Sequence, residues 1–153
     1  MFNRIGKALR IVSDEKKKKI AVIIDGPSLI PNFELENLKK LKNALNQIGV
    51  VKIGKIISNR QLTKDELNKI HSQGFQQEIV TSDIPLYVTL RAMEILPSEV
   101  YDIIAIGTTD PIFFPLFSRI KKEKNVALIS WKEKITESME SMADYIIYLD
   151  LLE

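Results

Sequence analysis

Short apolar runs rich in β-branched residues alternate along this chain with longer segments in which apolar residues recur at helical spacing. The short runs predict strands, and the longer segments predict amphipathic helices. Because the strand runs are apolar throughout instead of alternating with polar residues, we expect a sheet covered by helices on both faces. The expected strands are 20–24, 50–57, 77–80, 103–106, 126–129 and 145–149, and the expected helices are 35–48, 64–71, 86–96, 113–122 and 135–142.

This order of elements predicts one three-layer α/β domain with a mainly parallel central sheet over residues 20–153. The chain of 153 residues has the size of a single domain, and we find no internal repeat or low-complexity linker that would divide it. Loops that follow parallel strands collect at one edge of the sheet, where ligands usually bind. Functional residues should therefore lie at the carboxyl ends of the strands.

Three aspartates, two basic side chains and several hydroxyl groups fall at these strand ends. Together they are suited to an oxygen-ligated Mg²⁺ or Mn²⁺ facing a phosphodiester. The segments concerned are Asp25, Ser58-Asn59-Arg60-Gln61, Asp83, Thr108-Thr109-Asp110 and Ser130-Trp131-Lys132.

Helix capping is the competing interpretation of these aspartates. Asp110 precedes Pro111 and an apolar helix, so capping and site chemistry both remain open for it. Asp83 stands two residues before Pro85 and the next helix, which favours capping. Asp25 ends a buried strand with no periodic helix directly behind it, which favours a ligand or hydrogen-bonding role. Trp131 is open to stacking on a base or, as we favour, to packing.

Several function classes lack the residues that they need. Cysteine is absent, which excludes disulfides and thiolate metal sites and fits a cytoplasmic protein. The single histidine, His71, gives a catalytic triad little support, and the glycines match neither a dinucleotide-binding loop nor a P-loop. We therefore expect no nucleotide or organic cofactor. The formal charge of +2 neither requires nor excludes a nucleic-acid partner.

Residues 1–19 form a basic segment that we separate from the α/β domain. Its apolar residues have the spacing of a short amphipathic helix, which we interpret as a terminal helix docked on the domain in preference to a membrane or partner anchor. No stretch of the chain approaches the roughly 20 apolar residues that span a bilayer. The apolar positions are Phe2, Ile5, Leu9 and Val12, the cations between them are Arg4, Lys7 and Arg10, and Lys16 to Lys19 follow.

Four segments together resemble the NYN domain family, whose members are related to PIN-domain ribonucleases. They are 20–28 (IAVIIDGPS), 86–96 with Ala92-Met93-Glu94, 103–116 (IIAIGTTDPIFFPL) and 143–147 (ADYII). The resemblance covers roughly residues 20–150. It implies a Rossmann-like PIN fold, an acidic pocket that binds Mg²⁺ or Mn²⁺, and endonucleolytic cleavage of RNA.

Two of the family's acids are retained. Asp25 matches the aspartate that ends the first strand, and Asp110 matches the first aspartate of an Asp-x-Asp-Phe motif whose phenylalanine is Phe113. The resemblance thereby implies catalytic roles for Asp25 and Asp110. These two would hold one weakly bound Mg²⁺, with Asp83 assisting through water, because Mg²⁺ commonly keeps several waters.

Three other acids of the family are replaced, by Ile112, Pro85 and Arg91, and Ser28 stands where asparagine is common. If the helix that carries Arg91 faces the pocket, these changes move the charge of the site by about four units. A two-metal centre needs several carboxylates, so the acidic site is degenerate relative to the family.

We therefore expect an RNA-binding protein whose nuclease activity is weak or lost. Two alternatives stay open: an active Mg²⁺- or Mn²⁺-dependent endoribonuclease, and a protein-interaction module. RNA is the expected partner, and a homodimer or a protein partner is also open. The expected nucleic-acid contacts are Ser28, Asn59, Arg60, Arg91, Thr108, Thr109 and Lys132.

Overall fold

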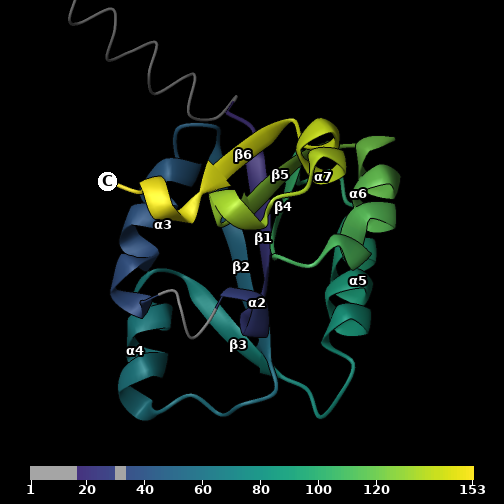
Figure 1. Cartoon of the computed structure of the whole chain (residues 1–153). Coiled ribbons are helices and arrows are strands. Elements are labelled where there is room, and N and C mark those ends of the chain that lie inside the picture. Colours follow the sequence, from purple (N-terminus) through teal and green to yellow (C-terminus); the bar gives the residue numbers. More distant parts are fainter. Residues whose placement is uncertain (1–16, 30–33) are drawn as a thin grey trace, which may run out of the picture.

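A computed structural model describes residues 17–29 and 34–153 (Figure 1). Its centre is a six-stranded sheet in the order β3-β2-β1-β4-β5-β6, and every neighbouring pair of strands is parallel. The predicted α/β fold with a parallel central sheet is confirmed. The strands are β1 Lys19–Asp25, β2 Val50–Ser58, β3 Phe75–Ile79, β4 Ile103–Gly107, β5 Asn125–Ser130 and β6 Tyr145–Tyr148.

Helices cover both faces of the sheet, as the apolar strand runs required. Buried leucines of α3 and Ile70 of α4 pack on one face, in a cluster with Val22 and Ile24 of β1. Val88 of α5, Phe117 of α6 and Met139 of α7 pack on the other face. The helices are α2 Gly26–Leu29, α3 Leu38–Leu45, α4 Lys64–Ser72, α5 Ile84–Ile95, α6 Phe114–Lys121 and α7 Glu137–Met142.

Short 3₁₀ turns join these elements, at η1 Leu35–Asn37, η2 Pro111–Phe113, η3 Lys132–Lys134 and η4 Leu149–Leu151. They account for part of the differences from the predicted helices. The segment predicted as one helix from residue 35 to 48 is divided into η1 and α3, and α3 ends at Leu45. The short helix α2 was not predicted, because a single turn that begins Gly-Pro carries no apolar periodicity. The short amphipathic helix expected over residues 2–12 lies outside the described residues.

The order of the strands fixes where a ligand can bind. From the central strand β1 the chain passes outward to β2 and β3, and it then returns to β4 and continues outward to β5 and β6. The connections after β1 and β4 therefore leave in opposite directions, which opens a crevice at the carboxyl ends of these two strands.

Gly26, directly after β1, permits close packing at this crevice. A Cβ atom at this position would stand 2.7 Å from the carbonyl oxygen of Ile57 and 3.0 Å from the Cβ of Ser58. Any larger residue would push the end of β1 away from β2. The glycine thus holds the turn after Asp25 against the neighbouring strand.

Candidate acidic site at the carboxyl edge of the sheet

Asp25, at the end of β1, is the buried centre of the site. Its side chain is only 5% exposed. Its Oδ2 atom accepts a hydrogen bond from Ser28 Oγ at 2.5 Å and another from Thr108 Oγ1 at 2.9 Å. The helix α2 places Ser28 one turn beyond Asp25, and the parallel pairing of β1 with β4 places Thr108 beside it. One carboxylate oxygen of Asp25 is therefore occupied by two hydroxyl groups.

Thr108 also links Asp25 to Asp110. Its Oγ1 accepts a hydrogen bond from the backbone N–H of Asp110 at 3.0 Å, and Thr108 is fully buried. Asp110 Oδ1 accepts from the backbone N–H of Ile112 at 2.9 Å and caps η2, with Pro111 in the first position. Capping is thus one role of Asp110, and its carboxylate also lines the cavity described below.

Asp83 caps α5 in the way that its position before Pro85 predicted. Its Oδ1 lies 3.4 Å from the backbone N of Leu86, and its backbone has a left-handed φ of 55°. A non-glycine residue at positive φ is uncommon, and aspartate is among the residues that tolerate it best. The strained turn directs the chain from β3 into α5 beside the same cavity.

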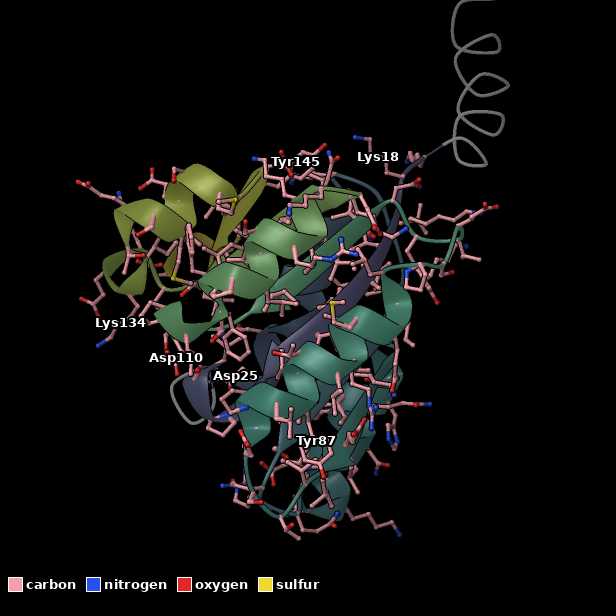
Figure 2. The ribbon with its side chains drawn as sticks, turned by 90° about the vertical axis from the view of Figure 1, so that its right-hand side faces the viewer. Lys18, Asp25, Tyr87, Asp110, Lys134 and Tyr145 are labelled. Atoms are coloured by element: carbon pink, nitrogen blue, oxygen red, sulfur yellow. The ribbon has the colours of Figure 1, made fainter. Side chains whose placement is uncertain are left out.

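A cavity of about 740 Å³ opens between these loops. Figure 2 shows Asp25, Asp110 and Lys134 following one another along this end of the molecule. The walls of the cavity come from the loops after β1, β2, β3, β4 and β5, so the strand ends at the predicted carboxyl edge do form one site. The lining residues are Asp25, Pro27, Ser28, Asn59, Ser82, Asp83, Ile84, Pro85, Thr109, Asp110, Pro111, Trp131 and Lys134.

Arg60 and Arg91, two of the predicted RNA contacts, do not line this cavity. Arg60 forms an ion pair with Glu66 at 3.2 Å. Arg91 donates from Nε and Nη2 to the two carboxylate oxygens of Glu78 at 2.7 Å each, and it pairs with Glu94 at 2.8 Å. Arg91 therefore joins α5 to β3, and its charge is neutralised there instead of entering the cavity as the sequence comparison had led us to expect.

Lys132, the third predicted basic contact, lies in η3 next to the cavity without lining it. Its backbone N–H donates to Asp150 Oδ1 at 3.1 Å. Two residues further on, Lys134 lines the cavity instead, and so does Ser82 of the loop before α5. Sequence analysis missed both. Lys134 ends the 3₁₀ turn η3, and the sequence analysis did not predict this turn.

Trp131 packs against the core, as we favoured, and it also borders the cavity. Its indole packs against the apolar cluster on the α3 side of the sheet and also lines the cavity. A large aromatic ring that is fixed by packing on one side and faces a polar cavity on the other is suited to stacking.

The carboxylates of this site are not arranged as a cluster of three metal ligands. Within residues 17–29 and 34–153, no group of three or more aspartate, glutamate, histidine or cysteine side chains is arranged to hold a metal ion. One carboxylate oxygen of Asp83 and one of Asp110 each cap a helix. One oxygen of Asp25 accepts hydrogen bonds from Ser28 and Thr108. The residues present therefore do not fit a centre of two metal ions, which needs several carboxylates.

The ion pair of Arg60 with Glu66 has a measurable consequence at low pH. Hydrogen bonds from Arg60 and from the backbone of Thr63 lower the pKa of Glu66 from 4.5 to about 2. The pKa of Glu66 is lower in the folded state than in the unfolded state, so its ionised form stabilises the fold. This stabilisation of the fold is complete above pH 4.5 and is lost as the pH falls toward 2. We expect Glu66→Gln to cost about 1 kcal/mol in urea unfolding at pH 6 and almost nothing at pH 2.5.

Glu133→Gln, at an exposed position of η3, is the control for this measurement. It should leave the free energy of unfolding unchanged at both pH values. An equal loss at pH 6 and pH 2.5 for Glu66→Gln would mean that the charge of Glu66 does not stabilise the fold.

A parallel sheet with helices on both faces and an acidic crevice at its carboxyl edge defines a Rossmann-like, PIN-like domain. The chain belongs to the NYN domain family, whose model matches residues 19–150. It is 27% identical over 143 residues to an uncharacterized protein of Methanocaldococcus jannaschii, a match that covers 90% of this chain and 60% of that protein.

A solved structure shares the fold. The crystal structure of a Vibrio parahaemolyticus protein of unknown function superposes with a TM-score of 0.71 at 19% identity, covering 88% of this chain and 94% of that one. At this identity the likeness establishes the fold alone. Across the described portion of the chain, every helix is too short or too polar to cross a bilayer.

Proposed function

We propose that this NYN protein binds RNA at the carboxyl-edge cavity and that its nuclease activity is weak or lost. The observation that carries the proposal is the state of Asp25, whose Oδ2 is occupied by the hydroxyl groups of Ser28 and Thr108. A divalent ion needs several oxygen ligands to replace its water, and the described residues supply no cluster of three metal-binding side chains. The fold of the family is present, and a reduced set of metal ligands would leave a surface that binds RNA without cleaving it efficiently.

The charges of the cavity suggest how RNA would lie in it. Three aspartates and one lysine line it, so the phosphates of a bound strand would be repelled from Asp25, Asp83 and Asp110. Carboxylates accept hydrogen bonds from base amino groups, and an indole stacks on any base. We therefore expect bases to point into the cavity against Trp131 and phosphates to follow Lys134.

Polar side chains complete this proposed surface. Asn59 and Thr109 line the cavity beside Ser28 and can exchange hydrogen bonds with bases or ribose hydroxyl groups. Lys132 is exposed in the same turn as Lys134 and extends the basic border. Arg60 and Arg91 are not part of this surface.

A metal-dependent endoribonuclease is the second candidate. It is favoured by one observation, the contact of both Asp25 and the Asp110 backbone with Thr108, which brings the two retained acids to one cavity. In that case Asp25 and Asp110 would be the catalytic carboxylates holding one Mg²⁺ or Mn²⁺, with Asp83 acting through water.

Binding of a fluorescently labelled single-stranded RNA, followed by anisotropy at low salt, tests the first candidate. We expect Trp131→Ala to weaken binding about 5- to 150-fold, the equivalent of one lost stacking contact. Trp131→Phe should keep most of the affinity because it keeps an aromatic face. Lys134→Gln should lower the slope of log affinity against log salt by about 0.7, whereas Lys122→Gln, outside the cavity, should not.

Incubation of the same RNA with Mg²⁺ or Mn²⁺ separates the two candidates. We expect no cleavage beyond that in the metal-free control, and no change in affinity when metal is added. Metal-dependent cleavage that disappears in Asp25→Asn would establish the endoribonuclease instead. If no RNA is bound even at low salt, both candidates fail and a protein-interaction module is the candidate that remains.

A further inference from the structure

Asp110 is half-buried at the cavity and bonds through only one of its carboxylate oxygens within the described residues. Its Oδ1 accepts from the backbone N–H of Ile112 at 2.9 Å, and no donor within residues 17–29 and 34–153 bonds to its Oδ2. A carboxylate has about four acceptor sites, so Oδ1 also retains one. Both oxygens of Asp110 can therefore accept hydrogen bonds from a ligand in the cavity.

The other two aspartates of the cavity are less suited to accept from a ligand. Asp25 is only 5% exposed, and its Oδ2 already accepts from Ser28 and Thr108. Asp83 is exposed, so water competes for its oxygens. A hydrogen bond is electrostatically stronger where water is partly excluded. Asp110 combines partial burial with available acceptor sites, and it is therefore the carboxylate that discriminates best between ligands.

A hydroxyl donor and an aromatic ring line the same cavity as Asp110. Thr109 is the preceding residue, and its hydroxyl group forms no hydrogen bond to any part of the chain that the structure describes. The strand β5 lies next to β4, so Trp131, at the end of β5, belongs to the loop beside the one that carries Asp110. The cavity thus offers an acceptor-only group, a neutral donor and a flat apolar ring to one ligand.

Two buried polar atoms at the end of β5 lack hydrogen-bond partners among the described residues. They are Ser130 Oγ and Trp131 Nε1, and Ser130 is fully buried. The register of β4 with β5, which pairs Gly107 with Ile129, puts Ser130 next to Thr108 at the carboxyl edge. Nearly all buried polar groups in proteins are paired, so these atoms mark a place where a polar ligand or ordered water completes the bonding. This observation is independent of the aspartates.

Guanine is the base whose edge fits this combination of groups. Its Watson–Crick edge presents two parallel donors, N1–H and N2–H, and a carboxylate can accept from both at once. The adjacent O6 accepts from a hydroxyl group. Uracil presents one N–H between two carbonyl oxygens, and a carboxylate repels those oxygens. Adenine and cytosine each present one amino group beside an unprotonated ring nitrogen, whose lone pair a carboxylate also repels.

We propose that the cavity selects guanine within single-stranded RNA. Asp110 accepts from N1–H and N2–H of the base, the hydroxyl group of Thr109 donates to O6, and the ring stacks on Trp131. Asp110 is then the residue that determines which base is bound. This assignment rests on the RNA binding proposed above and adds the base that the cavity recognises.

Competition between short RNAs tests this selection. A labelled oligouridine reports binding to the full chain by anisotropy, and unlabelled UUGUU, UUIUU and UUUUU compete with it, where I is inosine, which is guanosine without the N2 amino group. We expect UUGUU to bind about 5- to 150-fold more tightly than UUUUU, the equivalent of one bidentate contact to a base. The affinity of UUIUU should lie between the two.

The same competition separates this proposal from the RNA binding on which it rests. If oligouridine binds but the three competitors have equal affinities, guanine selection is overturned and RNA binding stands. If no RNA binds at low salt, both are overturned.

Asp110→Asn tests the assignment to one carboxylate. Asparagine is a good helix-capping residue, so the turn η2 keeps its cap, but one acceptor oxygen becomes a donor. We expect the preference for UUGUU over UUUUU to shrink to less than about threefold. Asp83→Asn is the matched control, because it makes the same change of charge in the same cavity, and it should keep the preference. Loss of the preference in Asp83→Asn, or its persistence in Asp110→Asn, would overturn the assignment.

Discussion

Phe113→Ala is expected to lower the free energy of unfolding by about 3–5 kcal/mol. Phe113 is 2% exposed and packs in the apolar cluster under α5 and α6. It ends the turn η2 that Asp110 caps, so the same residue closes the core and holds the loop of the acidic site. Removing the ring leaves a cavity that the rigid sheet cannot fill. Urea unfolding followed by circular dichroism measures the loss.

Ile112 provides the matched control for this substitution. It precedes Phe113, is comparably apolar and is 59% exposed. Ile112→Ala should change the free energy of unfolding by no more than about 0.5 kcal/mol. Should Phe113→Ala fail to fold, Phe113→Leu gives a smaller loss of the same sign. Similar losses for Ile112→Ala and Phe113→Ala would contradict the orientation of this turn.

Thr108→Val has the second largest expected effect, a loss of about 1.5–3 kcal/mol. Valine keeps the shape of the buried side chain but removes the hydroxyl group that donates to Asp25 Oδ2 and accepts from the Asp110 N–H. Asp25 would keep its donor Ser28 but remain buried with one hydrogen bond fewer, and the Asp110 N–H would lose its acceptor. Leaving buried polar groups unpaired costs more than the net value of the bonds.

Thr108→Ser separates the hydroxyl group from the shape of the side chain. It should retain most of the stability, whereas Thr109→Val, at the half-exposed neighbouring position, should cost less than about 1 kcal/mol. A double-mutant cycle of Thr108→Val with Asp25→Ala, which removes the acceptor that asparagine would keep, should give a coupling energy of at least about 0.5 kcal/mol. Additive losses in that cycle would mean that the bond between Thr108 and Asp25 does not stabilise the site.

The sheet was predictable because its inner strands β1, β4 and β5 are buried on both faces and are therefore almost entirely apolar. The observed β1 is one residue longer than the predicted run at each end, and β4 is one residue longer at its carboxyl end. The edge strand β3 was predicted less well and begins at Phe75 instead of residue 77. Its polar residues Gln76 and Gln77 have no counterpart in the fully covered strands, because an edge strand is only partly covered.

The residues that line the cavity could be predicted from the sequence about as well as the strands could. Asp25, Asp83 and Asp110 line one cavity because the carboxyl ends of parallel strands share one edge of the sheet. The basic residues were placed less well, since a long side chain is directed by its ion-pair partner. Arg91 binds Glu78 of β3, and Arg60 binds Glu66 of α4.

By itself, the sequence determined the parallel α/β sheet, the NYN resemblance and the aspartates at the strand ends, because local apolar patterns and turn residues encode them. Only the tertiary structure decided what those aspartates bind. Asp25 and Thr108 are 83 residues apart in the chain and meet because β1 pairs with β4. Hydrogen bonds between side chains depend on strand register and loop direction to within an ångström, and no local pattern in a sequence specifies these.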